Sequence, residues 1–287
     1  MDKVSTSNAP ASSNTPGSPN ALGDFLRARR EQVMPEEVGL SPGVGLRRVA
    51  GLRREEVAML AGISADYYLR LEQGRDRHPS VQVLDAIAGV LRLDADTTAY
   101  MIGLTRARSS KAARPAAEKV PPSILHLVAE LSQPAFVQGR YFDVLASNAM
   151  ARALSPNLAP GANRLLAAFL DPAERALYRG WAQATAKIVA QLRADIGEAV
   201  DDPRAAALVG ELSLKSEAFR RLWARHDVRR GTSVVSLIRH PEVGDLDLFC
   251  DKLAIAGADG MRLVIYHAEP GTESARALAL LGSLTVS

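Results

Sequence analysis

The stretch that most constrains the fold runs from Leu52 to Gly74, where two short helical patterns follow each other with almost no connection. In the first pattern, Val57, Leu60 and Ala61 recur at the spacing that gives a helix one apolar face. Gly62 follows directly, and glycine readily adopts the left-handed conformation that ends a helix. The sequence therefore predicts a helix that ends at Gly62 and a second helix that begins immediately afterwards.

The second helix has its own start signal and its own apolar face. Ser64 is suited to the N-cap, because its hydroxyl can accept a hydrogen bond from a free backbone N–H of the next turn. Tyr68 and Leu71 repeat the apolar spacing as far as Gly74, so the remaining side chains face away from the core. An ordinary pair of packed helices in a helical domain is the alternative interpretation of this stretch.

The paired helices resemble the DNA-binding helix-turn-helix of the XRE (Cro/repressor-like) family. The residues that carry the resemblance are Val57, Ala58, Gly62, Ile63, Tyr68, Leu71 and Glu72. In such a motif the second helix lies in the major groove of double-stranded DNA, and its N-terminal half contacts base edges. The resemblance implies five base-facing candidates, which are Ser64, Ala65, Asp66, Tyr67 and Arg70. It also implies that Arg29 or Arg30 of the first helix pairs with Glu72.

Arg70 is the base-contact candidate with the strongest chemical case, because a guanidinium can donate two parallel hydrogen bonds to guanine O6 and N7. Asp66 has two interpretations, since a carboxylate in the first turn either contacts a base or stabilises the helix dipole. Other arginines are predicted to contact DNA phosphates, with a solvated basic surface as the alternative. These arginines are Arg47, Arg48, Arg53, Arg54 and Arg75.

Length and composition favour a two-domain protein of a reducing compartment. A chain of 287 residues can bury two cores, and 47% hydrophobic content with only 5% aromatic residues is typical of a largely helical protein. The net charge of +3 permits a nucleic-acid partner without requiring one. Cys250 is the only cysteine, so no intrachain disulfide can form. The chain lacks a bilayer-length apolar run and a secretion signal, so we expect a cytoplasmic protein without a membrane partner.

Composition changes along the chain predict four segments. Residues 1–20 are polar and proline-rich, which predicts a disordered arm. Residues 21–104 are predicted to form an all-α domain of five helices, and residues 105–122 a basic linker without apolar periodicity. Residues 123–287 contain both strand and helix patterns, which predicts an α+β domain with one antiparallel sheet and helices on one of its faces.

The predicted strands lie at both ends of the second domain. They cover Ala135–Gly139, Tyr141–Ala146, Thr232–Arg239, Asp245–Leu253 and Met261–Ala268. The predicted helices lie before, between and after them, over Ile124–Leu131, Asn148–Leu154, Asp171–Leu192, Arg204–Leu212, Glu217–His226 and Glu273–Leu281. The helix that begins at Asp171 is the longest of these.

This second domain resembles the PAS-like ligand-binding domain of MmyB-like regulators, which in that family follows an XRE domain. The resemblance is most specific at Phe169–Pro172, Leu208–Ser213, Phe219–Val228, His240–Gly244 and Tyr266–Gly271. It implies a small apolar ligand such as a bound fatty acid. Candidate pocket residues are Phe136, Phe142, Asn148, Arg164, Phe169, Tyr178, Trp181, Trp223, His226, Arg239 and Tyr266. A solid core made of the same aromatic residues is the alternative.

No sequence pattern points to catalysis. The five histidines never occur two, three or four positions apart, so no helix or strand carries a pair of metal ligands. The sequence also has neither a nucleophile elbow nor a phosphate-binding loop. We therefore predict no enzyme, no catalytic residue and no metal, but a transcriptional regulator that binds a DNA operator as a homodimer. A small-molecule-modifying enzyme and an interaction scaffold are the alternatives.

Overall fold

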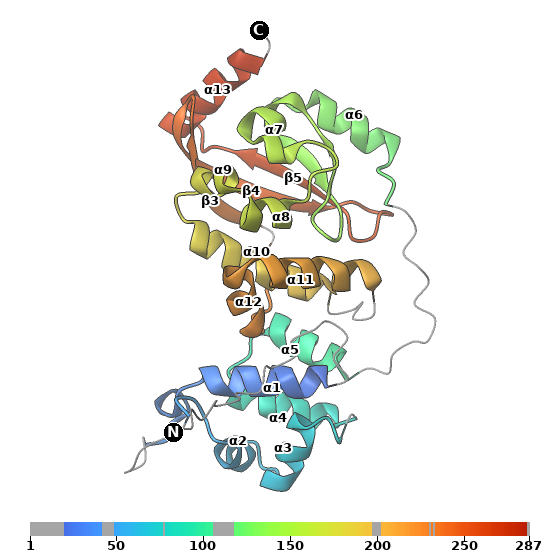
Figure 1. The fold of residues 1–287 in the computed structure, drawn as a ribbon, viewed down its shortest axis with the longest axis vertical. Coiled ribbons are helices and arrows are strands. Elements are labelled where there is room, and N and C mark those ends of the chain that lie inside the picture. Colours follow the sequence, from blue (N-terminus) through green and yellow to red (C-terminus); the bar gives the residue numbers. More distant parts are fainter. Residues whose placement is uncertain are drawn as a thin grey trace, which may run out of the picture.

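A computed structural model describes residues 20–41, 49–76, 78–105, 118–196, 202–229, 231 and 233–285. A helical N-terminal part and an α+β part lie one above the other along the long axis (Figure 1). This arrangement confirms the predicted fold class. Almost all of the predicted arm, the central part of the predicted linker, and Arg47 and Arg48 lie outside the described residues.

Among its described residues, the N-terminal part has five α-helices with one 3-10 turn after the first. They are α1 (Ala21–Gln32), η1 (Pro35–Val38), α2 (Arg54–Leu60), α3 (Ala65–Glu72), α4 (Val81–Val90) and α5 (Ala95–Gly103). The predicted turn signals are confirmed, because Gly62 has a φ of 68° and the Ser64 hydroxyl accepts a hydrogen bond of 3.1 Å from the Tyr67 backbone N–H. Phe25, Tyr68 and other side chains of α1 to α5 form one buried core.

The C-terminal part places helices before, between and after the strands. The elements are α6 (Pro122–Glu130), β1 (Ala135–Gln138), β2 (Val144–Ser147), α7 (Ala149–Leu154), η2 (Pro156–Leu158), α8 (Arg164–Leu170), α9 (Pro172–Leu177), α10 (Trp181–Ile196), α11 (Pro203–Lys215), α12 (Glu217–Ala224), β3 (Ser233–His240), β4 (Gly244–Ala254), β5 (Arg262–His267) and α13 (Glu273–Thr285). The strands form one sheet in the order β2-β1-β5-β4-β3, and every neighbouring pair is antiparallel. All five strands were predicted.

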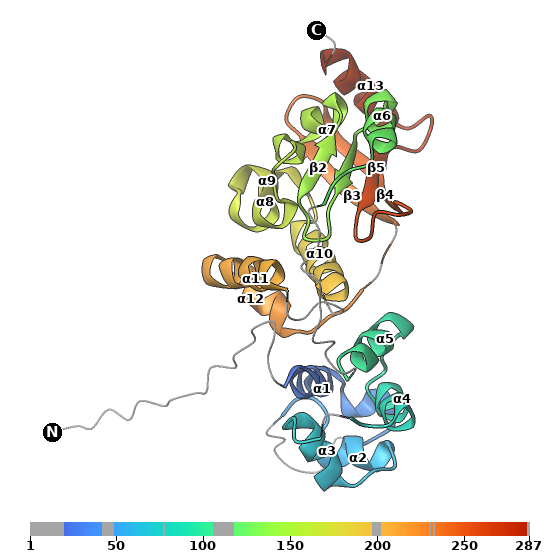
Figure 2. The same ribbon diagram turned by 90° about the vertical axis from the view of Figure 1, so that its right-hand side faces the viewer.

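Helices cover both faces of the sheet, so the predicted one-sided cover is wrong. On one face, Phe136 and Leu248 pack with side chains of α7 and α13. On the other face, Val137 and Leu263 pack against Val128 of α6. Figure 2 shows α6 beside strand β2. The prediction failed because α6 is a short helix whose apolar face gives no indication of which side of the sheet it covers.

The predicted long helix from Asp171 to Leu192 is wrong, because it is divided into α9 and α10. Between the two helices, Tyr178 pairs with Ile238 in an antiparallel bridge, and the Arg179 backbone N–H donates a hydrogen bond of 3.0 Å to the Leu237 carbonyl. The free edge of strand β3 thus supplies hydrogen-bond partners that compete with the helix. The break leaves Tyr178 and Arg179 against the sheet edge.

The second strand also begins later than predicted, at Val144 instead of Tyr141. The residues in between form a turn, in which the Gly139 backbone N–H donates to the Asp143 carbonyl at 2.9 Å. Phe142 occupies the left-handed region with a φ of 67°, which strand residues do not adopt. Its ring is fully buried, so tertiary packing overrides the apolar alternation that predicted a strand here.

Candidate DNA-binding surface and ligand cavity

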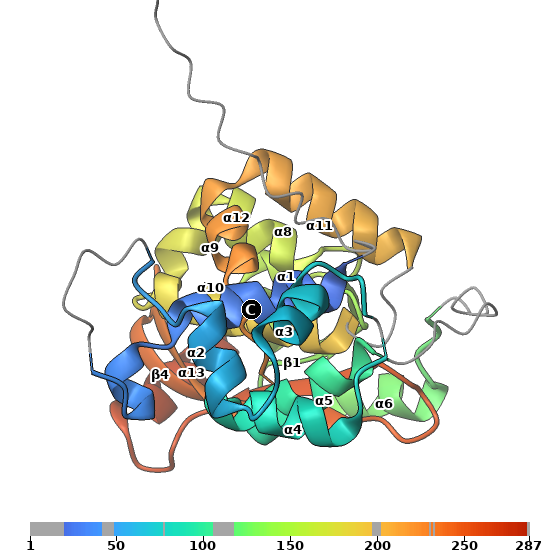
Figure 3. The same ribbon diagram turned by 90° about the horizontal axis from the view of Figure 1, so that it is seen from below.

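Helices α2 and α3 lie at the end of the molecule remote from the sheet (Figures 1 and 3). Tyr68 and Leu71 anchor α3 in the core, with no exposed surface. The predicted base-facing residues lie on its other side: Ser64, Ala65, Asp66 and Arg70 are exposed, and Tyr67 is half-buried. Arg70 forms an ion pair of 3.3 Å with Asp66 and lies over the Tyr67 ring. The structure therefore brings the five candidates together on one outward surface.

Glu72, at the end of α3, forms two ion pairs through a carboxylate that is only 1% exposed. Arg30 Nε donates to one carboxylate oxygen at 2.6 Å and Arg54 Nε donates to the other at 2.6 Å. Arg30 also donates to the Leu52 carbonyl at 2.8 Å. The pairing of Arg30 with Glu72 is confirmed, and this network connects α1, α2 and α3.

Arg54 therefore differs from the simple phosphate contact that the sequence suggested. Its Nε donates to the buried Glu72 carboxylate, while the side chain as a whole remains 42% exposed. This role was missed because Glu72 lies 18 residues away, beyond any local helix spacing. Arg53 and Arg75 are exposed, as expected of phosphate contacts.

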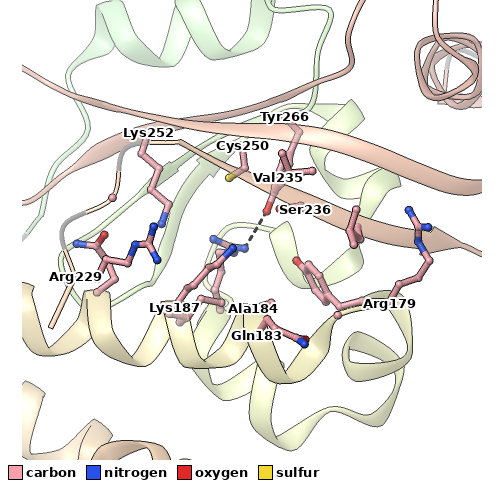
Figure 4. Close-up of a pocket in the computed structure, with 17 residues that line it drawn as sticks. Arg179, Gln183, Ala184, Lys187, Arg229, Val235, Ser236, Cys250, Lys252 and Tyr266 are labelled. Carbon is pink, nitrogen blue, oxygen red and sulfur yellow. Dashed lines mark hydrogen bonds between the residues drawn. The ribbon is translucent and has the colours of Figure 1, made fainter. Parts of the chain in front are cut away.

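A cavity with a volume of about 360 Å³ lies between α10 and strands β3, β4 and β5 (Figure 4). Its walls come from the α9–α10 break, α10, the residues before β3, and the strands. The lining residues are Arg164, Tyr178, Arg179, Gly180, Gln183, Ala184, Lys187, Ile188, Gln191, Arg229, Gly231, Val235, Ser236, Leu237, Cys250, Lys252 and Tyr266. Burial raises the pKa of the Cys250 thiol, so this cysteine remains protonated at neutral pH.

Three of the predicted pocket residues, Arg164, Tyr178 and Tyr266, line this cavity. Arg164 is 8% exposed and donates hydrogen bonds of 3.1 Å to Gln138 Oε1 and to the Tyr266 hydroxyl. Its guanidinium lies over the ring of Phe136, another predicted residue, 5.0 Å from the ring centroid. Phe136 thus supports the site through Arg164 and does not line the cavity.

The other predicted pocket residues have different positions. Phe142, Phe169 and Trp223 pack in a separate core among α8, α10, α11 and α12. Asn148 caps α7 and binds backbone groups of residues 131–135, which is a structural role. Trp181 and Arg239 line a neighbouring, more open hollow. Aromatic content identified buried residues correctly, but it could not distinguish a core from a cavity wall.

Most of the cavity residues from α10 and the strands were missed in the sequence. Lys187, Ile188 and Gln191 lie on a helix whose start was predicted ten residues too early, so their orientation could not be assigned. Lys252 lies on a strand that was predicted correctly, but its partner wall is α10, which is distant in sequence. The signal that was available is Gly180, a helix-disfavouring residue directly before Trp181.

His226, also predicted for the pocket, lies at the contact between the two parts of the chain. The residue is 7% exposed, and its ring meets Phe25 of α1 in an edge arrangement, with centroids 6.2 Å apart. Arg193 of α10 donates to His226 Nδ1 at 3.1 Å. Because a guanidinium can only donate, this contact requires a neutral ring with a free Nδ1 lone pair. Burial, Arg193 and Arg29 lower the pKa of His226 to about 2.

This burial predicts a pH dependence of stability. In the unfolded chain His226 has the ordinary pKa of 6.5, whereas in the folded chain it remains neutral. Its contribution to stability is therefore complete above pH 6.5 and is lost progressively as the pH falls below 6.5. We expect the free energy of unfolding to fall by about 1.4 kcal/mol per pH unit in this range. In chemical denaturation of the full chain, His226→Gln should remove this part of the pH dependence, whereas exposed His126→Gln should retain it. An unchanged slope in His226→Gln would contradict the prediction.

The described residues contain neither a metal-binding cluster nor a membrane-spanning helix. No group of three His, Cys, Asp or Glu side chains among them is arranged to hold a metal ion. None of the helices in that part of the chain is both long enough and apolar enough to span a membrane.

Comparison with known families agrees with the two parts of the structure. A family model described as a helix-turn-helix domain matches residues 21–101. A second, described as the ligand binding domain of MmyB-like transcription regulators, matches residues 120–281, which is more than half of the 287-residue chain. A search of curated proteins found no match. With an exposed helix α3 at one end and a cavity beneath the sheet, the chain belongs to the MmyB-like transcription regulators and combines a helix-turn-helix domain with a ligand-binding domain.

Proposed function

We propose that this regulator recognises a specific double-stranded DNA operator through α3 and that a small molecule in the α10 cavity controls its DNA affinity. The observation that carries the first part is the outward surface of α3. Arg70 is exposed on it, and the buried Arg30–Glu72 pair at the end of the same helix fixes its orientation. A rigidly held helix with an exposed arginine in its reading half suits base recognition in the major groove.

Selection from a random duplex library tests operator recognition. The full-length protein should enrich one sequence, and titrations should give an affinity for it at least about 10³-fold above that for random duplex at the same salt concentration. Equal affinity for selected and random DNA would reduce the helix-turn-helix to a nonspecific DNA contact.

We propose a fatty-acid-like ligand, meaning a small amphiphile with an apolar chain and an acidic head group. Tyr178, Ala184 and Ile188 provide apolar walls, and Arg164 provides a buried cation that can bind an acidic group. The cavity volume of about 360 Å³ lies within the usual range for small-molecule sites.

Control of DNA binding requires a connection from the cavity to the N-terminal helices. Arg229 lines the cavity, and its backbone N–H donates to the Ala190 carbonyl of α10 at 3.2 Å. Two residues earlier, Asp227 pairs with Arg29 of α1 at 2.9 Å. Arg29 is adjacent to Arg30, which holds Glu72 of α3. A short chain of direct contacts therefore joins the cavity wall to the recognition helix.

Further contacts attach the same segment to the DNA-binding part. The Gln32 amide donates to the Arg225 carbonyl at 2.6 Å, and Val228 is buried in the core formed by α1 to α5. The pKa of Asp94 lies below its ordinary value. Burial raises this pKa, but hydrogen bonds from Thr97 and the charges of Arg29 and Arg229 together lower it by more. A ligand that shifts Arg229 acts on the groups that hold α1 and α5. It changes DNA affinity if it binds the DNA-binding conformation of the protein and the conformation that does not bind DNA with unequal affinities.

The coupling can be tested by removing one contact of this segment. Octanoate should change the operator affinity of the original protein, and Asp227→Asn should reduce that change without affecting octanoate binding. Glu217→Gln removes a carboxylate of an exposed pair on α12 and serves as the matched control, which should retain the full effect. If Asp227→Asn responds like the control, the Asp227–Arg29 contact does not transmit the signal.

We also propose a homodimer, because one recognition helix contacts too few base pairs to define a single genomic site. Footprinting should reveal two related half-sites about one helical turn apart, or a multiple of that distance. Light scattering at the same protein concentration should give twice the chain mass. A single unrepeated half-site together with a monomer mass would exclude this assembly.

A further inference from the structure

We propose that the head group of the cavity ligand carries two negative charges, as a phosphate monoester does, so that the ligand is an amphiphilic phosphate ester. The proposal rests on the small-molecule control described above and deepens it by specifying the head group. It follows from the number, placement and partners of the basic side chains in the cavity wall.

Among the described residues, the cavity wall contains five basic side chains and no Asp or Glu. One of the five is already neutralised, because Arg179 pairs with Asp245 and Asp247. Among the residues that the structure describes, Arg164, Lys187 and Lys252 form no ion pair with a carboxylate. No carboxylate of the described residues thus neutralises these three cations by a direct ion pair, and Glu174 and Asp195 act on Arg164 and Lys252 only from a greater distance.

Arg164 is the most demanding of these charges, because its side chain is buried and remains protonated. Its partners, Gln138 Oε1 and the Tyr266 hydroxyl, are neutral acceptors. Gln138 itself is fully buried, and its Nε2 has no acceptor among the described residues. A buried cation without a counter-ion is costly, and an anionic ligand at Arg164 would remove much of that cost.

Lys252 adds a second charge from the sheet. Burial lowers its pKa and the charges of Arg164 and Arg262 act in the same direction, whereas Cys250 and Asp195 act in the opposite direction. Figure 4 shows Lys252 extending from β4 toward α10, with Arg229 beside it. Lys187 approaches from the opposite wall, on α10. A carboxylate supplies one negative charge to this group, whereas a phosphate monoester supplies close to two and three acceptor oxygens.

The apolar part of the wall selects an amphiphile over a purely polar phosphate. Tyr178, Ala184 and Ile188 provide surface along which an alkyl chain can be buried, whereas a polar ester such as glycerol 3-phosphate leaves that surface uncovered. Metabolite and lipid sources share the same phosphate head group, and they are distinguished by the length of the apolar chain.

Calorimetric titration of the full-length protein at pH 7.5 tests the proposal with ligands that differ in one feature each. Octyl phosphate should bind about tenfold more tightly than octanoate, because it makes at least one further charge-assisted hydrogen bond. Octanol lacks the charge, while glycerol 3-phosphate and inorganic phosphate lack the chain. All three should bind more weakly than octyl phosphate.

Matched variants place the effect in the cavity. Lys252→Gln and, separately, Lys187→Gln should remove most of the preference for octyl phosphate over octanoate, with octanol binding unchanged. Lys215→Gln removes an exposed lysine of α11 outside the cavity and should retain the preference. Two cavity variants keep the test decisive if one of them fails to fold.

Equal affinities for octyl phosphate and octanoate would overturn the dianionic head group while leaving a fatty-acid-like ligand in place. Retention of the preference in both cavity variants would overturn the assignment to this site. Absence of binding by every ligand would overturn the inference as well, and the operator titrations decide the DNA-binding function independently of that outcome.

Discussion

Replacing Glu72 with glutamine is expected to lower the free energy of unfolding of the N-terminal helices by about 3–5 kcal/mol. The substitution keeps the shape of the side chain but removes the charge that neutralises Arg30, whose side chain is only 5% exposed. A buried cation without its partner carries a desolvation penalty that hydrogen bonding to a neutral amide only partly offsets. Arg54 is 42% exposed and can turn to solvent, so its loss contributes less.

The expected measurement is a lower midpoint of the first transition in thermal or urea unfolding of the full chain. Glu55→Gln makes the same change at an exposed position of α2 and should have little effect. Because the network joins α1, α2 and α3, Glu72→Gln should also weaken binding to operator and random DNA together. A loss of stability below about 1 kcal/mol would mean that the carboxylate charge is not what holds these helices.

Replacing Arg70 with alanine is expected to cost about 1–3 kcal/mol of binding free energy at the preferred operator and much less on random DNA. The reason is that a bidentate contact to guanine is made only at the correct base. In the absence of DNA, Arg70 pairs with Asp66, but both side chains are exposed and such a pair is weak. Breaking that pair to reach a base therefore adds only a small cost.

Arg75→Ala is the matched comparison, because Arg75 is exposed beyond the end of α3. Because Arg75 is expected to contact a phosphate, its replacement should weaken binding to operator and to random DNA equally. It should also reduce the slope of log affinity against log salt concentration by about one. Titrations of both variants at two or more salt concentrations separate the two roles. If Arg70→Ala leaves the ratio of operator to random affinity unchanged, Arg70 does not read a base.

The helix-turn-helix was predictable from sequence because its signals are local. Gly62 and Gly74 each end a helix in the left-handed conformation, with a φ of 68°, and Ser64 caps α3 with its own hydroxyl. The side chains involved lie within one or two turns of each other. The strands of the α+β part were likewise predicted from alternation and turn residues within each segment.

The Glu72 network was only partly predictable. Resemblance to a known family implied an arginine partner from α1, but it did not distinguish Arg29 from Arg30. The structure assigns Arg30 to Glu72 and Arg29 to Asp227, because adjacent residues on a helix point in directions about 100° apart. Which of the two faces α3 depends on how α1 docks, and that is a property of the whole fold.

The sequence alone therefore determined the helix-turn-helix, the helix that presents Arg70, and the presence of all five strands, although not the bounds of every element. Tertiary structure decided the ligand site. The break at Tyr178 and Arg179 exists because strand β3, more than fifty residues later, offers a free edge to their backbone groups. That break separates α9 from α10 and, with strands β3 to β5, forms the cavity and its excess of positive charge. Hydrogen-bond competition between segments so distant in the chain depends on their final positions in space, which no local pattern of residues encodes.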